Sequence, residues 1–202
     1  MESSEKKTIV IATNNRHKLE EYKQILTNYN IITLNDIGFS EDIEETGETF
    51  EENALIKAKT IYNYLKNKKQ EYLVLAEDSG LCVDALNGAP GVYSARYAEI
   101  HGDDQANRDK LQKELKGKER TAYFSCTIVV IYPNGTHKTF EGKTLGEITK
   151  EEIGSKEFGY DCVFYSKDLN KTFGEASEEE KNKVSHRGRA IKKMLKEMDN
   201  NV

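Results

Sequence analysis

The chain has 202 residues, of which 37% are apolar and 32% charged, and this composition suits one large domain or two closely packed lobes. Its formal net charge of −5 argues against binding along duplex nucleic acid, although a local cluster of Lys and Arg could still meet a small anionic ligand. We expect neither a signal peptide nor a membrane span, because the start is polar and no apolar run approaches the roughly 20 residues that a membrane helix needs.

The early part of the chain begins with a strand and a helix. Residues 8–13 ("TIVIAT") predict a short apolar strand, and a polar stretch follows. A helix is expected next, because apolar residues recur at helical spacing: Leu19, Tyr22, Ile25 and Leu26.

A second helix and a second strand follow. Thr49 and Glu52 form a capping-box pattern, which predicts a helix start. The apolar stripe of this helix is Phe50, Ala54, Ala58, Ile61 and Leu65. Residues 72–76 ("YLVLA") predict a buried strand that ends at two adjacent acids, Glu77 and Asp78.

The later part of the chain predicts a hairpin and a final helix. A long strand over 122–132 is followed by a turn at 133–135 and a partner strand, and 162–165 predicts a further strand. A capping box at Ser177 precedes a last helix with Ala190, Ile191, Met194, Leu195 and Met198 on one face. Strands and helices alternate early and a hairpin comes late, so we expect a mixed-sheet α/β fold.

The three cysteines, Cys82, Cys126 and Cys162, are odd in number, far apart and in apolar surroundings. That pattern is typical neither of a disulfide framework nor of a zinc site. We expect reduced thiols in the core of a cytoplasmic protein.

The polar stretch after the first strand is a candidate phosphate site. A strand, a loop and a helix start bring backbone N–H groups and the helix dipole to one point, and Lys18 adds a full charge. The glycines of a P-loop are absent, so an ordinary strand-to-helix connection is the alternative.

Lys57 and two acids are candidates for a metal and phosphate site. Lys57 lies on the flank of the second helix's apolar stripe, where it could cover the core edge or point into a cleft. Glu45 becomes informative if Asp78 converges on it, because two carboxylates suit Mg²⁺ bound to substrate phosphates. Gly80 would let the chain turn after the acids. Alternatively, Glu77 and Asp78 only cap the next segment.

Two later segments could bind a nucleotide base. Residues 158–161 ("FGYD") offer two aromatic rings, which could stack on a base or belong to the core. Basic and polar residues near the last helix start could bind a purine edge and phosphate: Lys181, Ser185, His186 and Arg187. A charged helix start is the alternative, although basic residues are poorly placed there for the helix dipole.

Taken together, five ordered segments resemble the inosine triphosphate pyrophosphatase family: "ATNNRHKLEE", "EETGETFEENALIKA", "AEDSGLCVDALNGAPGVYSARYA", "FGYDCVF" and "EEKNKVSHRGRA". The resemblance runs from Ile9 to Ile191. It implies a mixed central sheet flanked by helices, in two lobes with an active-site cleft between them. We expect a single domain over residues 1–202, with flexible tails at 1–7 and 199–202.

The resemblance also implies an activity. Family members hydrolyse non-standard purine nucleoside triphosphates (ITP, dITP and XTP) to the monophosphate and pyrophosphate, with Mg²⁺ as cofactor and Mn²⁺ as a candidate substitute. It implies a homodimer as well, with "NGAPGVYSARYA" at the dimer-facing surface or the pocket rim. Neither a nucleic-acid polymer nor a membrane is an expected partner.

The family's site residues carry over as three groups. Phosphate binding falls on Thr13, Asn14, Asn15, Arg16, His17, Lys18 and Lys57. Metal binding falls on Glu45 and Asp78, and Asp78 is also the expected activator of the attacking water. Substrate binding in the pocket falls on Ser79, Phe158, Gly159, Tyr160, Asp161, Lys181, His186 and Arg187.

Several positions depart from the family pattern. Asn14 replaces a glycine, and we expect the loop to survive because asparagine tolerates positive φ. Glu77 stands where aspartate is frequent, Cys162 where proline is frequent, and 172–177 is a looser match. None of these changes removes a residue assigned to the chemistry.

Two other functions remain open at this level. One is a related pyrophosphatase for modified pyrimidine or methylated nucleotides, against which the "FGYD" and "SHR" segments argue. The other is a non-catalytic nucleotide sensor. The pair Glu45 and Asp78 argues against a sensor, because extra negative charge does not help a protein that only binds a polyanion.

Overall fold

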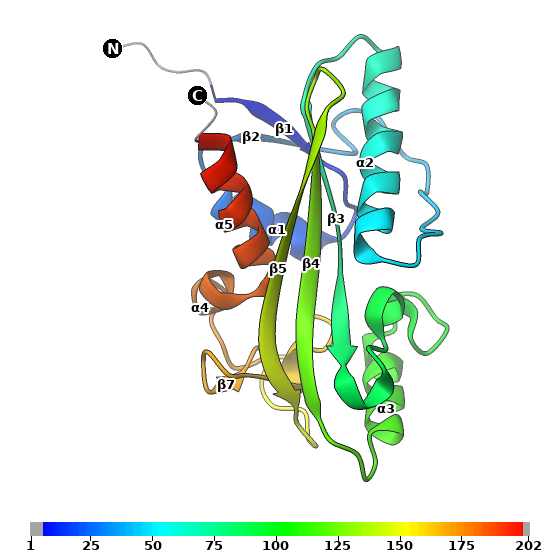
Figure 1. Ribbon diagram of the computed structural model, residues 1–202, viewed down its shortest axis with the longest axis vertical. Helices are drawn as coiled ribbons and strands as arrows, with labels where there is room; N and C mark the ends of the chain where they lie inside the picture. Colours follow the sequence, from blue (N-terminus) through cyan, green and yellow to red (C-terminus); the bar gives the residue numbers. More distant parts are fainter. Residues whose placement is uncertain (1–5, 200–202) are drawn as a thin grey trace. The chain divides into compact units, whose positions relative to one another are not determined.

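The computed structural model describes residues 6–199 (Figure 1). Residues 1–5 and 200–202, which belong to the expected tails, lie outside the described residues. Seven strands form one mixed sheet in the order β2-β1-β3-β4-β5-β6-β7. They are β1 (Thr8–Ile11), β2 (Asn30–Thr33), β3 (Leu73–Val83), β4 (Thr121–Ile131), β5 (His137–Ile148), β6 (Phe164–Ser166) and β7 (Lys171–Thr172). The predicted mixed α/β fold is confirmed.

The helices are α1 (Arg16–Ile25), α2 (Phe50–Asn67), α3 (Asp104–Glu114), α4 (Glu178–Val184) and α5 (His186–Asp199). Strand β1 pairs in parallel with β2 and β3, whereas β6 pairs antiparallel with β5 and β7. Two compact units divide the chain: unit 1 is Met1–Asp78 with Thr127–Phe140, and unit 2 is Ser79–Cys126 with Glu141–Val202. The active-site cleft expected between two lobes stays a prediction.

Helix α2 covers the core of unit 1. Its predicted capping box is confirmed, with the Thr49 hydroxyl accepting from the Glu52 N–H and the Glu52 carboxylate accepting from the Thr49 N–H. Four of the five predicted stripe residues pack on β1, β3 and the end of β4 and are at most 1% exposed: Ala54, Ala58, Ile61 and Leu65. The fifth, Phe50, is only partly buried. Burial of this stripe fixes which helix face, and hence which polar flank, lies near β3.

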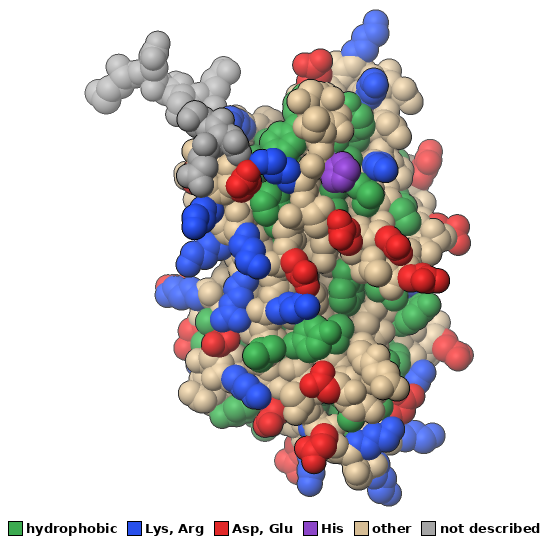
Figure 2. All heavy atoms as spheres, in the orientation of Figure 1, with side chains coloured by type: hydrophobic (Ala, Val, Ile, Leu, Met, Phe, Trp, Pro, Cys, Tyr) green, Lys and Arg blue, Asp and Glu red, His purple; other side chains and the backbone are tan. Residues whose placement is uncertain are grey.

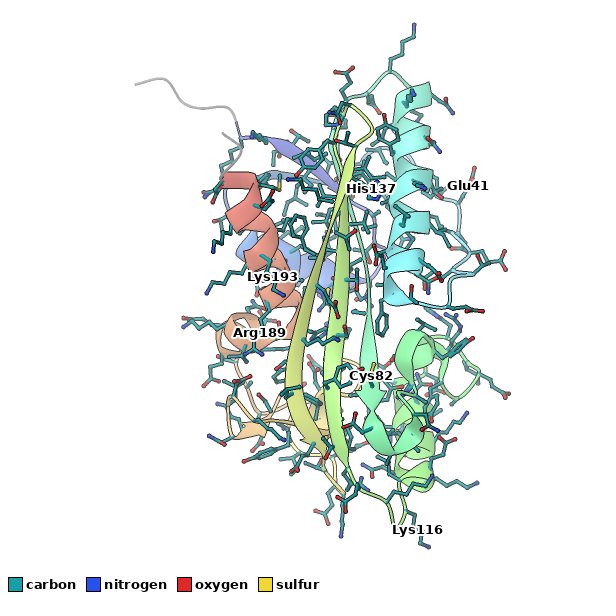
Figure 3. All side chains as sticks on the ribbon, viewed as in Figure 1. Glu41, Cys82, Lys116, His137, Arg189 and Lys193 are labelled. Atoms are coloured by element: carbon teal, nitrogen blue, oxygen red, sulfur yellow. The ribbon has the colours of Figure 1, made fainter. Side chains whose placement is uncertain are left out.

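In unit 2, α5 runs beside β5 (Figure 1). A side chain at Gly142 of β5 would place its Cβ 2.1 Å from the His186 carbonyl oxygen and 2.5 Å from the Ala190 nitrogen, so only glycine fits there. The outward face of α5 carries Lys and Arg side chains (Figure 2), among them Arg189 and Lys193 (Figure 3). The predicted amphipathic last helix is confirmed.

Strand β3 corrects one expectation. The strand was expected to end at Ala76 and the chain to turn at Gly80, but β3 continues through both acids to Val83. The reading in which Glu77 and Asp78 cap the next segment is wrong for the same reason. Glu77 and Asp78 can lie inside a strand because each side chain has a polar partner within unit 1.

Two smaller expectations are settled by the same structure. Cys82 on β3 (Figure 3), Cys126 and Cys162 are all buried and none forms a disulfide, as predicted. The strand expected over 162–165 begins later, since Asp161–Val163 is a 3₁₀ turn and β6 starts at Phe164. Within residues 6–199, no helix is both long and apolar enough to cross a membrane.

Candidate active site

Glu77 is a buried carboxylate with two partners on α1. It is 2% exposed, its Oε1 lies 2.9 Å from Lys18 Nζ, and its Oε2 accepts a hydrogen bond from Tyr22 Oη over 2.6 Å. Lys18 and Tyr22 are four residues apart and therefore lie on one face of the helix. This pairing stabilises the buried charge and directs Lys18 toward β3.

Asp78 is the second buried acid, 6% exposed, and it accepts a hydrogen bond from Asn53 Nδ2 over 3.0 Å. Burial raises the pKa of Asp78 above its ordinary value, and the charge of Lys57 opposes that shift. The carboxylate of Glu45 raises the pKa of Asp78 further, so the two acids predicted to share a metal influence each other electrostatically.

Glu45 and Lys57 form an ion pair, with 2.5 Å between Glu45 Oε1 and Lys57 Nζ. Both side chains are mostly buried, at 24% and 14% exposure. Lys57 therefore extends from the flank of α2 toward an acid, and the predicted orientation into a cleft stays a prediction. Lys57 does not only cover the core edge.

Asn53 is a site residue that the sequence analysis did not assign. It is fully buried on α2, its Oδ1 accepts from the Gly47 N–H over 2.7 Å, and its Nδ2 donates to Asp78. A Cβ at Gly47 would lie 2.7 Å from Asn53 Oδ1, so glycine permits this approach. The one available signal was a buried-face amide one turn before Lys57.

The predicted phosphate loop is built around the cap of α1. Asn15 is the N-cap, its side chain accepts from the Lys18 N–H over 3.1 Å, and its own N–H donates to Thr13 Oγ1 over 3.1 Å. Thr13 is half-buried, and the segment 14–17, which includes Arg16 and His17, is exposed. Asn14 is not among the described non-glycine residues with a positive φ angle. The loop therefore does not depend on the tolerance of asparagine for positive φ.

The carboxylates of Glu45 and Asp78 fit a magnesium site better than a closed zinc site. Over residues 6–199 there is no group of three or more His, Cys, Asp or Glu side chains placed to hold a metal. Mg²⁺ is usually held by one or two carboxylates, with waters and substrate phosphates completing its coordination. Glu45 and Asp78 match that requirement, and the raised pKa of Asp78 reflects a buried negative charge that a cation would offset.

The predicted base-binding residues of unit 2 form two clusters. In the first, Lys181 Nζ lies 2.7 Å from Asp161 Oδ2 and 4.8 Å from the centre of the Phe158 ring. Lys181 is 7% exposed although it carries a charge. Tyr160, which precedes Asp161 in the sequence, is a core residue that donates from Oη to the Ser94 carbonyl oxygen over 2.7 Å. Phe158 is therefore the better candidate for stacking.

The second cluster joins α5 to β3. Arg187 is 1% exposed and donates from Nη2 to Ser79 Oγ over 3.2 Å. His186 stacks on Phe124 with 4.7 Å between the ring centres. Asp78 belongs to unit 1 and to the predicted metal group, whereas Ser79, the next residue of β3, belongs to unit 2 and to the predicted base group.

Comparison with known proteins places this chain in a family. The Ham1 family model matches residues 9–197. The chain belongs to the Ham1 family. This Ham1 chain is 48% identical over 194 residues to the dITP/XTP pyrophosphatase of Clostridium perfringens, covering 93% of this chain and 95% of that protein. It is also 48% identical over 195 residues to the dITP/XTP pyrophosphatase of Bacillus subtilis, covering 94% and 96%.

A solved structure supports the same assignment for the Ham1 fold. The Staphylococcus aureus Ham1 protein superposes with a TM-score of 0.86 at 41% identity, covering 97% of this chain and 100% of that one. The predicted resemblance is confirmed, because the family match and these relatives cover nearly the whole Ham1 chain.

Proposed function

We propose that this protein is a pyrophosphatase for non-standard purine nucleoside triphosphates, with dITP, ITP and XTP as substrates. Relatives named dITP/XTP pyrophosphatase at 48% identity support the substrate class. The observation that carries the chemistry is Asp78, a buried carboxylate whose pKa is raised by burial and by Glu45. A buried, electrostatically coupled acid is more typical of a functional site than of a solvated surface.

Glu45 and Asp78 hold Mg²⁺ in this proposal, with Mn²⁺ as its substitute. The cation, when bound, neutralises charge on the substrate's phosphates. The Asp78 carboxylate, which accepts a hydrogen bond from Asn53 Nδ2, is also the proton acceptor in this proposal. Asp78 takes a proton from the water that attacks the α-phosphorus, and pyrophosphate leaves as the nucleoside monophosphate forms.

Lys18 and Lys57 bind the phosphates. Without substrate each lysine pairs with an acid, Glu77 and Glu45 respectively, so both ammonium groups are already held inside unit 1. Phosphoryl transfer depends mainly on alignment and charge stabilisation, which prepositioned cations supply. The exposed residues 14–17 add N–H groups at the start of α1.

Selectivity comes from the unit 2 residues. Hypoxanthine and xanthine present an oxygen at C6, where adenine presents an amino donor. Arg187 can donate to that oxygen. The C6 amino group of adenine would instead face the Arg187 guanidinium as a second donor, and an unpaired buried donor costs about 1–3 kcal/mol. Phe158 supplies a stacking face, and Lys181 and Asp161 supply polar groups beside it.

A homodimer is part of the proposal. Within "NGAPGVYSARYA", Tyr93 is 58% exposed, and Ile100 just beyond it is 61% exposed. Both exposed apolar side chains are available to contact a second copy of the chain. Light scattering at micromolar concentration is expected to give twice the chain's 23.0 kDa mass, and a single-chain mass would contradict the dimer.

A substrate panel tests the activity. Pyrophosphate release is measured at steady state for ITP, XTP, GTP, ATP and a set of modified pyrimidine and methylated nucleoside triphosphates, with Mg²⁺ and with Mg²⁺ chelated. We expect high kcat/KM for ITP and XTP and loss of activity on chelation. Equal kcat/KM for ATP and ITP would contradict the base selectivity, and turnover only of modified pyrimidine or methylated nucleotides would replace the substrate class.

A further inference from the structure

Both backbone polar groups of Gly159 are held by side chains of α3. The Gly159 N–H donates to Asp104 Oδ2 over 2.9 Å, and Arg108 Nη1 donates to the Gly159 carbonyl oxygen over 2.7 Å. Asp104 and Arg108 are four residues apart and so lie on one face of the helix. The peptides on either side of Gly159 are therefore fixed by a single rigid element.

Arg108 is itself locked in place. It is 3% exposed, its Nε donates to Glu152 Oε1 over 2.8 Å, and its Nη2 donates to Gln105 Oε1 over 2.9 Å. Hydrogen bonds from Lys156 and Arg108 lower the pKa of Glu152 to about 2, so Glu152 stays charged at neutral pH. A buried guanidinium with partners on three of its nitrogens has little freedom to move.

The segment that Gly159 belongs to carries the predicted base contacts. Phe158 and Asp161 are joined by a turn in which the Asp161 N–H donates to the Phe158 carbonyl oxygen over 3.2 Å. Lys181 contacts both of their side chains, at 2.7 Å from Asp161 Oδ2 and 4.8 Å from the centre of the Phe158 ring. A shift of the Gly159 peptides would therefore move the ring and the carboxylate together.

We propose that Asp104 and Arg108 are positioning residues for base recognition, which act by fixing the peptides of Gly159. This inference rests on the proposed function, because it takes Phe158 and Asp161 as base-binding groups. Neither α3 residue touches the base in this account. Their contribution is preorganisation, which lowers the ordering cost of binding without adding a contact.

Steady-state kinetics of Asp104→Ala and Arg108→Met test the proposal. For each variant we expect KM for ITP to rise about tenfold with little change in kcat, and the ITP/ATP ratio of kcat/KM to fall by a similar factor. Asp104→Asn keeps an oxygen acceptor for the Gly159 N–H, so it is expected to stay within about threefold of wild type.

Arg120→Met is the matched control. Arg120 also belongs to unit 2 and donates to backbone carbonyls, those of Ile148 and Thr149. It is expected to lower the melting temperature and leave the ITP/ATP ratio unchanged. If Arg108→Met does not fold, the ITP/ATP ratios of Asp104→Ala and Asp104→Asn test the proposal.

Two results would overturn the proposal, and they differ. Folded Asp104→Ala and Arg108→Met variants with the wild-type ITP/ATP ratio would remove the positioning role and leave the proposed function intact. A wild-type protein that releases no pyrophosphate from ITP or XTP would remove the proposed function, and the positioning role with it.

Discussion

Asn53 binds Asp78 directly, with its Nδ2 donating to Asp78 Oδ2 over 3.0 Å inside unit 1. Its other amide atom, Oδ1, accepts from the Gly47 N–H over 2.7 Å. One fully buried amide thus links β3 to the loop that follows Glu45. The relative placement of the two candidate metal ligands depends on this side chain.

Asn53→Ala is expected to lower both stability and turnover. It leaves the Asp78 carboxylate and the Gly47 N–H without these hydrogen bonds, which costs about 2–4 kcal/mol of unfolding free energy. Urea unfolding measures the change. The control is Asn63→Ala, an exposed position on the same helix, which is expected to change stability by no more than about 0.5 kcal/mol. Equal effects of the two substitutions would contradict the role of Asn53.

Asp78→Asn is expected to reduce turnover of ITP about 1,000-fold or more, because it removes both a metal ligand and the proton acceptor. The far-UV circular dichroism spectrum is expected to stay native. Asp42→Asn, at an exposed acid of the same unit, serves as the control and is expected to keep wild-type turnover. Near-normal pyrophosphate release by Asp78→Asn would remove Asp78 from the mechanism.

The raised pKa of Asp78 predicts a pH-dependent stability difference. A carboxyl group with a raised pKa in the folded state favours folding most below its unfolded value of 3.8, and that contribution is lost as pH rises through the folded pKa. At pH 7 without metal, Asp78→Asn is therefore expected to melt at or above the wild-type temperature, with the gap closing toward pH 4. Melting curves between pH 4 and pH 7 measure the difference in melting temperature between Asp78→Asn and wild type. A difference that favours the variant more at pH 4 than at pH 7 would contradict the raised pKa.

Mg²⁺ is expected to stabilise the wild-type protein in the absence of nucleotide. At 100 times its dissociation constant, a ligand specific to the folded state adds about 2.7 kcal/mol. Glu45→Gln and Asp78→Asn are expected to lose most of this gain in a thermal-shift titration. Glu44→Gln, at the exposed neighbouring acid, should retain it. Equal gains in all four proteins would show that the cation binds elsewhere.

Arg187→Lys is expected to lower the ITP/ATP ratio of kcat/KM about tenfold. Lysine keeps the charge but loses the planar set of donors that reaches Ser79 Oγ and, in our proposal, the C6 oxygen. Arg189→Lys is the control, since Arg189 is on the same helix (Figure 3) and pairs with Asp168. An unchanged ratio in Arg187→Lys would move selectivity to other residues.

Much of the fold followed from periodicity and capping. The stripe and capping box of α2 are local patterns, and the structure confirms both. Helix α3 was not predicted, because its buried face includes the polar residues Asn107 and Arg108 beside Leu111 and so lacks an apolar stripe. The end of β3 was misplaced because the partners that stabilise Glu77 and Asp78 are distant in sequence.

The candidate site was predictable only in part. Lys57 pairs with Glu45, and Glu45 interacts electrostatically with Asp78. The metal and phosphate roles that residue types and family resemblance predict for these three residues stay predictions. Asn53, Asp104 and Arg108 were not assigned. Their hydrogen bonds span 25, 55 and 51 residues, and contacts at such separations leave no local pattern.

The fate of the attacking oxygen tests the central claim most directly. ITP is hydrolysed with Mg²⁺ in oxygen-18-labelled water, the products are separated, and their masses are measured by mass spectrometry. Attack at the α-phosphorus predicts one labelled oxygen in inosine monophosphate and unlabelled pyrophosphate. Label in pyrophosphate, or release of orthophosphate in place of pyrophosphate, would contradict the proposed reaction.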